Sequence, residues 1–302
     1  MTKPTHVLPV NASALKMLVC PQRYAFRVQH GLKPQVVAEA LSSGKAVHQF
    51  AEYIEQGDRQ SVAEMKVRAL ATTLPDKFFD IATKYMIMRQ RLPDPIVMPT
   101  GVKMVEYFFN YPWITLERKH AFYEIHICGT MDRICFKDGK IRIIDIKTTK
   151  KQKEDEIFDA YAASVQFYFY QWVIQEWGES LFYWDKELFA AVQEDNIVTH
   201  ILMCQVYSGK WLLGNEIYHT PTKMAQWKKE FLRSVEALVD SHDAQREAQA
   251  AGKIYETPRT GLINDQCGYC DYVPLCHAPD KATEMQNLAM GFVYDEYNPS
   301  KF

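Results

Sequence analysis

The chain has 302 residues, 47% hydrophobic and 24% charged, which is the composition of a soluble globular protein with one large domain or two small ones. The formal net charge of −2 excludes a polycation that attracts nucleic acid through its overall field, so contact with DNA would need local basic patches. No apolar run approaches the roughly 18 residues of a membrane span, and no apolar leader follows Met1, so we expect a cytoplasmic protein with no membrane partner.

The first third of the chain is predicted to be mostly helical. Residues 11–26 suit a short helix that is interrupted at Cys20-Pro21, because a proline disfavours helical backbone at the residue before it. Apolar positions then recur with helical spacing over residues 35–56, 60–73 and 75–91.

Beyond Pro99 the chain becomes rich in β-branched and aromatic residues. The pattern predicts strands over residues 102–110, 121–128, 131–137 and 140–147, a helix over about 157–177, strands near 185–193 and 197–207, and a helix over 221–250.

A hairpin in this region brings charged side chains together. If Asp138-Gly139 forms a two-residue turn, facing residue numbers sum to 277 and Asp132 lies opposite Asp145, with side chains about 5 Å apart. Strand alternation puts Lys147 on the same face as Asp145. Facing carboxylates repel each other unless a cation lies between them, and a hard divalent ion such as Mg²⁺ fits. Lys147 would then orient or deprotonate a water molecule.

The same residues also allow a structural interpretation. Asp132 and Arg133 can form a surface ion pair, and Asp145 and Lys147 can be the solvated end of a strand, as most charges at strand ends are. The hairpin alone leaves both interpretations open.

Five short elements follow one another along the chain: Gly44 to His48, Glu106, Gly129 to Asp132, Asp145 to Lys147, and Gln166 to Tyr170. In this order they resemble the G-x-x-x-H, upstream glutamate, G-x-x-D, D-x-K and Q-x-x-x-Y elements of RecB-like nucleases in the PD-(D/E)XK superfamily. The resemblance spans nearly the whole chain, and no element of the pattern is missing.

The resemblance implies a role for each of these residues. The metal, Mg²⁺ or Mn²⁺, would be bound by His48, Asp132, Asp145 and the backbone carbonyl of Ile146. The catalytic group would comprise Asp132, Asp145, Lys147, Glu106, Gln166 and Tyr170. Gln166 and Tyr170, one helical turn apart, would face the site and contact the DNA backbone or the other catalytic groups.

The resemblance also implies the architecture. We expect a restriction-endonuclease-like α/β core with a mixed central sheet flanked by helices, a helical N-terminal region and a C-terminal iron-sulfur segment. A single nuclease domain would occupy residues 1–302. Its parts would be a helical subregion at 35–95, the catalytic core at 96–210, and a cluster-binding region at 260–280 together with Cys20.

The cysteines near the end of the chain have ligand-like spacing, Cys267-x-x-Cys270-x5-Cys276. With Cys20 as the fourth ligand, the split pattern resembles the iron-sulfur nucleases of this family, which include AddB and the CRISPR-adaptation nucleases. The resemblance favours a 4Fe-4S cluster that staples the two ends of the chain. A structural zinc ion is the alternative, because four thiolates suit either metal.

Two further groups of residues complete the predicted site and its surroundings. Lys150, Lys151 and Lys153 directly follow the active-site strand and are candidates for contacts to phosphates, although such a run is commonly a solvated loop. Cys128 and two other cysteines, Cys135 and Cys204, lie in predicted strands, where a thiol usually acts as a small buried hydrophobic group.

The resemblance implies a metal-dependent DNA exonuclease, a hydrolase that acts on single-stranded DNA ends in recombination, repair or phage DNA metabolism. A role in trimming CRISPR spacers and a non-catalytic iron-sulfur DNA-binding subunit are the alternatives, of which the second fits less well with intact His48, Asp132, Asp145 and Lys147. The chain has no Walker loop, so any unwinding of DNA would require a helicase or recombination partner.

Overall fold

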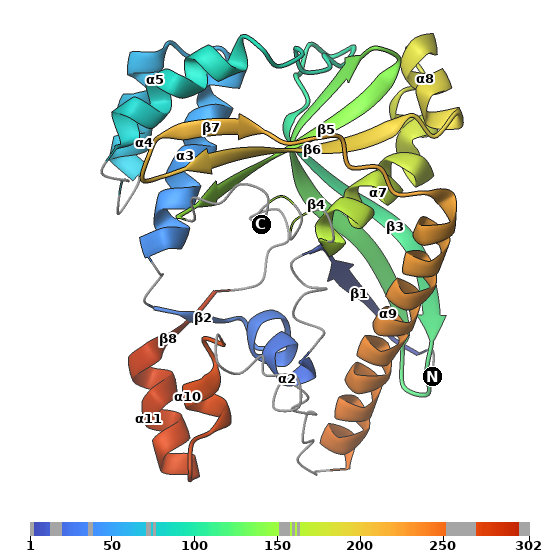
Figure 1. Ribbon diagram of the computed structural model, residues 1–302. Helices are drawn as coiled ribbons and strands as arrows, with labels where there is room; N and C mark the ends of the chain where they lie inside the picture. Colours follow the sequence, from blue (N-terminus) through green and yellow to red (C-terminus); the bar gives the residue numbers. More distant parts are fainter. Residues whose placement is uncertain are drawn as a thin grey trace. The chain divides into compact units, whose positions relative to one another are not determined.

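The computed structural model describes residues 3–12, 20–35, 39–70, 74, 77–150, 158, 161, 164–251 and 270–295 (Figure 1). The chain forms two compact units: unit 1 comprises Met1–Val37, Phe108–Gly129 and Ala225–Phe302, and unit 2 comprises Ala38–Tyr107 and Thr130–Met224. Every described residue predicted to act in catalysis or to bind the catalytic metal therefore belongs to unit 2.

The sheet of unit 2 is mixed. It is built from the end of β4 (Phe122–Lys137), then β5 (Lys140–Thr149), β6 (Ile197–Gln205) and β7 (Lys210–Leu213). Strands β4 and β5 pair antiparallel, β5 and β6 parallel, and β6 and β7 antiparallel. The parallel pair requires a crossover connection, which includes α7 (Val165–Leu181) and α8 (Lys186–Gln193). The predicted mixed sheet flanked by helices is thus present.

The turn between β4 and β5 has the predicted geometry. Asp138 and Gly139 both adopt positive φ, at 53° and 72°, as a type I′ turn requires. The paired residues include Arg133 with Ile144 and Lys137 with Lys140, so facing numbers sum to 277. The predicted hairpin register is therefore confirmed.

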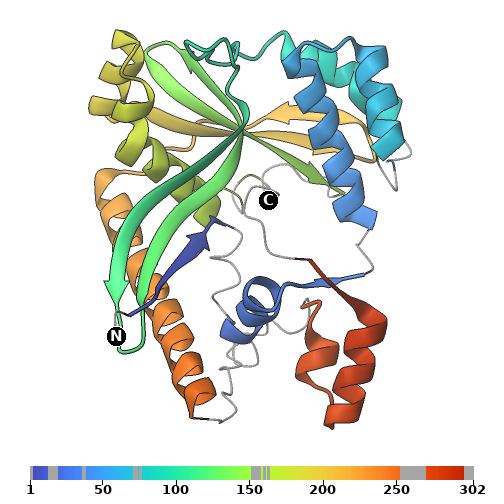
Figure 2. The same cartoon turned by 180° about the vertical axis from the view of Figure 1, so that it is seen from behind.

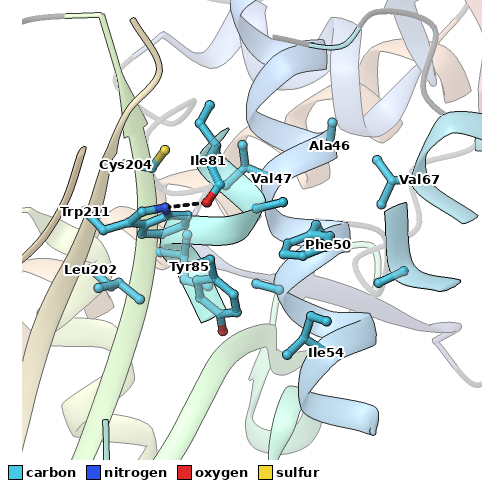
Figure 3. Packing of buried hydrophobic residues seen from close by; sticks show 14 of the residues in the cluster. Ala46, Val47, Phe50, Ile54, Val67, Ile81, Tyr85, Leu202, Cys204 and Trp211 are labelled. Carbon is cyan, nitrogen blue, oxygen red and sulfur yellow. Dashed lines mark hydrogen bonds between the residues drawn. The ribbon is translucent and has the colours of Figure 1, made fainter. Parts of the chain in front are cut away.

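Two helices of unit 2, α3 (Glu39–Gln56) and α5 (Phe78–Arg89), pack against this sheet, and α4 (Gln60–Leu70) packs against both of them. They lie beside the β6–β7 hairpin (Figures 1 and 2). Phe50 of α3 is central to their shared core, and the Trp211 indole of β7 donates a hydrogen bond to the carbonyl of Ile81 at 3.0 Å (Figure 3). The helices predicted for this part of the chain are present, although 36–38, 71–73 and 75–76 lie outside the described residues.

The strand predicted near residues 185–193 is wrong. This segment forms α8, because the Asp185 side chain accepts hydrogen bonds from the backbone N–H groups of Glu187 and Leu188 and so caps a helix. The predicted helix over 157–177 is observed as α7 from Val165, capped by Ser164. Much of the predicted stretch before Ser164 falls outside the described part of the chain.

Unit 1 joins segments from both ends of the chain. It contains β1 (Thr5–Val10), α2 (Pro21–Tyr24), the π-helical η1 (Ala25–Gln29), β2 (Leu32–Pro34), most of β3 (Val105–Glu117) and of α9 (Pro221–Ala250), α10 (Val273–Cys276), α11 (Lys281–Gly291) and β8 (Phe292–Tyr294). The long helix α9 has the predicted bounds, whereas β1 was not predicted. Within the described residues, no helix is long and apolar enough to cross a membrane.

A small core holds the two ends of unit 1 together. Strands β2 and β8 pair antiparallel, and the Phe26 and Tyr272 rings stack with centroids 5.6 Å apart. The Tyr272 hydroxyl donates a hydrogen bond to the carbonyl of Leu32 at 2.8 Å. Segments some 240 residues apart in sequence are thereby fixed against each other.

We predict that Phe50→Ala destabilises unit 2 strongly. The Phe50 ring is buried between Phe78 and Tyr85, with ring centroids 5.8 and 6.0 Å away, so truncation leaves a cavity that costs about 3–5 kcal/mol. Urea unfolding measures the loss. Met65→Ala on α4 is the control, because its side chain is 63% exposed and should change stability by about 0.5 kcal/mol or less.

Candidate active site

Three elements of unit 2 bring potential metal ligands together. His48 comes from α3, Glu106 from the start of β3 and Asp132 from β4, and one ligand atom of each lies within 4.8 Å of the others. Nδ1 of His48 is 3.5 Å from Oδ2 of Asp132. Two carboxylates and an imidazole at these separations can share a divalent cation.

The position of Asp132 depends on where β4 leaves β5. The paired residues of the two strands end at Arg133 and Ile144, and beyond that point the Ile146 N–H donates to the carboxylate Oδ2 of Asp132 at 2.6 Å. The side chain thus occupies the place of a backbone acceptor. Because β5 continues to pair with β6 as far as Thr149, a gap in the pairing opens on the β4 side only.

Asp145 is buried beside this gap, with 0% of the residue exposed. Its Oδ2 lies 2.6 Å from Nζ of Lys147, and its Oδ1 accepts a hydrogen bond from Nε2 of Gln166 at 3.0 Å. Gln166 also donates to the Tyr170 hydroxyl at 2.8 Å, which in turn donates to the carbonyl of Thr130 at 2.6 Å. Asp145 is therefore not a solvated strand end, and Gln166 and Tyr170 form a hydrogen-bonded chain from Asp145 to the backbone of Thr130.

The electrostatics of the cluster favour a bound cation. Burial raises the pKa of Asp145 to about 6 even though Lys147 lowers it, and burial likewise raises the pKa of Asp132. The pKa of Glu106 is also raised, first by burial and then by the neighbouring charges of Asp132 and Glu52. Burial thus outweighs the single ammonium group of Lys147, and a further positive charge would favour the ionised carboxylates.

The basic groups of the site have complementary properties. Burial lowers the pKa of His48, and the charge of Lys147 lowers it further, so the imidazole is neutral near pH 7 and able to bind a metal. For Lys147, burial alone would lower the pKa, but Asp145 and Asp132 raise it above its usual value. Lys147 is therefore protonated at neutral pH.

The backbone is strained at Glu106. This residue has φ of 46°, a left-handed conformation that is uncommon for a residue with a side chain longer than that of Asn or Asp. Such strain costs on the order of 1 kcal/mol and persists where the surrounding structure imposes it, most often at functional sites. It directs the Glu106 carboxylate into the group formed with His48 and Asp132.

The position of Gly44 shows why the G-x-x-x-H element begins with a glycine. A Cβ atom added at this position of α3 would lie 2.9 Å from Oγ1 of Thr148 on β5. The absence of a side chain lets α3 approach the strand that carries Asp145 and Lys147. His48, one helical turn later, is thereby brought to the site.

Arg133 does not have the exposed position that the structural interpretation of the hairpin gives it. It does not form a surface ion pair with Asp132; its guanidinium is buried and contacts the buried carboxylate of Glu55 on α3. Glu55 was not among the predicted site residues. The available signal was its position seven residues, or two helical turns, after His48, which puts both side chains on one face of α3.

The structure describes only some of the lysines predicted to contact DNA and of the cysteines predicted to bind a cluster. Lys150 is exposed, and its amine lies 5.6 Å from the centre of the Tyr207 ring. Lys151 and Lys153 lie outside the described residues, as does Cys267. The thiols of Cys20, Cys270 and Cys276 are partly exposed and all belong to unit 1.

The prediction that the remaining cysteines are small hydrophobic groups is confirmed. Cys128, Cys135 and Cys204 are fully buried, and burial raises the pKa of these thiols to between about 11 and about 12. They are therefore protonated and unreactive at neutral pH.

Comparison with known proteins identifies the family. The sequence profile of the PD-(D/E)XK nuclease superfamily matches residues 10–277, so the chain belongs to this superfamily. One similar solved structure, "Crystal structure of SSO0001", is 14% identical with a TM-score of 0.35, over 91% of this chain and 86% of that one; this TM-score is too low to establish a shared fold. Among curated proteins, none shows significant similarity to the chain.

Membership of this superfamily makes the protein a metal-dependent nuclease, a hydrolase with DNA as its substrate. The mixed sheet flanked by helices is consistent with a restriction-endonuclease-like fold. Nucleases of this superfamily use divalent metals, and the group of His48, Glu106 and Asp132 fits such an ion in ligand type and spacing. The buried carboxylates with raised pKa values supply the negative charge that the ion would neutralise.

We predict that Asp145→Asn stabilises the metal-free protein, and does so more at pH 8 than at pH 5. The folded-state pKa of about 6 exceeds the ordinary value of 3.8, so the folded protein binds this proton more tightly than the unfolded chain does. The contribution of Asp145 to stability is thus present at low pH and lost as the pH rises through about 6.

The expected gain at pH 8 is on the order of 2 kcal/mol, measured as thermal unfolding in EDTA. Asp94→Asn is the control, because the Asp94 side chain is 88% exposed. The pKa of His48 in the folded protein is about 4, and the charge of Asp145 raises it, so its imidazole is neutral at both pH values with and without Asp145. An equal gain at both pH values would contradict the prediction.

Proposed function

We propose that this protein is a RecB-like exonuclease that hydrolyses phosphodiester bonds at single-stranded DNA ends. The observation that carries the proposal is the Lys147–Asp145 pair next to the ligand group of His48, Glu106 and Asp132, all within unit 2. A charged donor beside a cation site is the arrangement that hydrolysis of a phosphodiester needs.

Each residue has a distinct task in this proposal. His48 and Asp132 hold the divalent ion, together with Asp145 and the carbonyl of Ile146. When bound, such an ion lowers the pKa of water and neutralises charge on the scissile phosphate. Lys147 keeps its proton because its pKa is raised, so it orients the attacking water or donates to a phosphate oxygen rather than acting as the base.

The remaining polar residues keep these groups in place. Gln166 fixes the carboxylate of Asp145 through Oδ1, which leaves Oδ2 directed to Lys147. Tyr170 anchors Gln166 to the backbone of Thr130, just before the metal-binding Asp132. Glu106 adds a third carboxylate to the ligand group.

For the cofactor we propose a 4Fe-4S cluster bound by Cys20, Cys267, Cys270 and Cys276. Support comes from unit 1, where Cys20 directly precedes α2, and Cys270 and Cys276 flank Tyr272, whose ring stacks on Phe26. Segments from the two ends of the chain are thus already packed in one small core. The cluster would act as a staple rather than as a redox catalyst.

The proposed substrate path leaves the active-site strand along Lys150, Lys151 and Lys153, whose charges would contact phosphates beside the scissile bond. A helicase or recombination partner would supply the unwound strand. The proposed context is recombination, repair or phage DNA metabolism, and trimming of CRISPR spacers would use the same chemistry.

We expect Lys147→Ala to abolish DNA cleavage while leaving DNA binding largely intact. Loss of a positioned charged donor costs about 100-fold or more in rate, whereas one lysine is a small part of the binding charge. End-labelled linear DNA, single- and double-stranded, is incubated with Mg²⁺, Mn²⁺ or EDTA. Lys140→Ala on the same strand is the control, since its amine pairs with Glu216 away from the site.

Circular single-stranded DNA separates the alternatives in the same assay. An exonuclease degrades the linear substrate and spares the circle, and the label released first gives its polarity. Cleavage of the circle would contradict the exonuclease proposal, and retained cleavage by Lys147→Ala would remove this lysine from the mechanism. If the wild type binds DNA but cleaves neither substrate, the non-catalytic binding subunit becomes the better account.

We expect Cys267→Ser to impair folding and solubility before it impairs DNA cleavage. Loss of one ligand would remove the brown iron-sulfur absorbance and lower the yield of soluble protein, because the staple between the chain ends is gone. Absorbance spectra and iron content measure the cluster. Cys128→Ala, a buried thiol without a proposed ligand role, should keep both. A soluble, colourless and fully active Cys267→Ser protein would contradict the staple.

A further inference from the structure

A buried ion pair lies next to the candidate metal site. The guanidinium of Arg133 contacts Oε1 of Glu55 through Nη1 and the carbonyl of Pro93 through Nη2, and the two side chains are 3% and 2% exposed. Glu55 also accepts a hydrogen bond from the Tyr85 hydroxyl at 3.1 Å and lies 3.4 Å from Nε of Arg89. One carboxylate oxygen thus gathers contacts from three side chains.

The pair adjoins the metal site along both of its elements. Arg133 is the next residue after Asp132 on β4, and Glu55 is two helical turns after His48 on α3. Glu55 and Arg133 line a pocket together with Glu106 and Asp132. Oε2 of Glu55 has no hydrogen-bond partner among the described residues, although it is buried at this pocket.

Apart from the polar contacts of His48 with Asp132 and the backbone of Ile146, α3 packs against the sheet through apolar side chains. Val47, Phe50 and Ile54 pack in one cluster with Ile144 and Ile146 of β5. Apolar contacts are non-directional, so they hold the helix against the sheet without fixing its position along its own axis. A shift of about 1.5 Å, the rise of a single residue, would separate His48 from Asp132.

A buried ion pair is directional. The guanidinium has a planar fork, and here its two terminal nitrogens contact acceptors on two different segments, Glu55 on α3 and Pro93 after α5. This arrangement permits one position of α3 relative to β4. The same position puts Nδ1 of His48 3.5 Å from Oδ2 of Asp132.

We propose that Glu55 and Arg133 are positioning residues that fix α3 against β4 and so set the geometry of the divalent-cation site. The inference rests on the proposed function only in that His48 and Asp132 bind the ion. Neither residue of the pair belongs to the ligand group of His48, Glu106 and Asp132. Their effect is exerted on the distance between the two ligands.

The test measures Mn²⁺ binding without DNA, by the electron paramagnetic resonance signal of free Mn²⁺. Glu55→Gln should weaken binding about tenfold or more, the usual scale for residues that orient metal ligands. Glu55→Met/Arg133→Met removes both charges and keeps apolar side chains of similar volume, so the fold should survive. Affinity should nevertheless stay about tenfold below that of the wild type.

The double variant distinguishes positioning from mere stability. If the pair only stabilises the fold, Mn²⁺ affinity returns to the wild-type value once unfolding temperature and circular dichroism show an intact fold, and the proposal is overturned. Arg133→Lys keeps the positive charge but replaces the planar guanidinium by a single ammonium group. It serves as the test of positioning if the other variants do not fold. A wild-type affinity there would also overturn the proposal.

A matched control lies in the same unit. Glu216→Gln removes the partner of Arg142, whose Nη1 lies 2.9 Å from Oε1 of Glu216, and should leave Mn²⁺ affinity unchanged. The titration also separates this inference from the proposed function. If the wild type binds Mn²⁺ but cleaves no DNA, the proposed nuclease function is contradicted and the positioning role of the ion pair is not. If the wild type binds no Mn²⁺, the positioning role itself is overturned.

Discussion

The structure of the site depends on the hydrogen bond between the Ile146 N–H and the carboxylate of Asp132, 2.6 Å long. It replaces a backbone contact where β4 leaves β5, and so lets the strands separate without an unpaired buried N–H group. The gap that results holds Asp132, Asp145 and Glu106, whose raised pKa values show how costly their charges are there. The site is stable with ionised carboxylates only if positive charge is supplied, and this need is the physical basis of metal dependence.

The rest of unit 2 keeps this gap open. Strand β6 is buried throughout and pairs in parallel with all but the first residue of β5, so Asp145 and Lys147 sit on a rigid strand. On one side α7 presents Gln166 to Asp145; on the other, Gly44 allows α3 to come close enough for His48 to reach Asp132. The strained backbone of Glu106 lies at a pocket that residues of α3 and β4 also line.

The parts of the site that depend on local chemistry were predictable from the sequence. The Asp138-Gly139 turn fixes the register of its own hairpin as far as Arg133 and Ile144, so a few adjacent residues predict that Asp132, Asp145 and Lys147 lie near one another just beyond the last pair. His48 and Glu106 come from distant segments, and only the resemblance to a family placed them here. The segment after Asp185 was misread because its apolar residues suit a strand, whereas the capping aspartate decides for a helix. Glu55 was missed because nothing in a sequence shows that a charge is buried.

The candidate metal-ligand group and the Glu55–Arg133 pair lie at one pocket and belong to one electrostatic arrangement. Arg133 follows Asp132 directly and would be its natural counter-ion, as the structural interpretation of the sequence assumed. Glu55 of α3 instead forms an ion pair with this guanidinium, so the charge of Arg133 is already neutralised. Lys147 is then the cation that lowers the pKa of both Asp132 and Asp145, and a single ammonium group does not balance three carboxylates. Although Arg133 lines the same pocket as Asp132 and Glu106, its charge is matched by Glu55, so the ion pair that orders the scaffold leaves the positive charge of the site to a divalent ion.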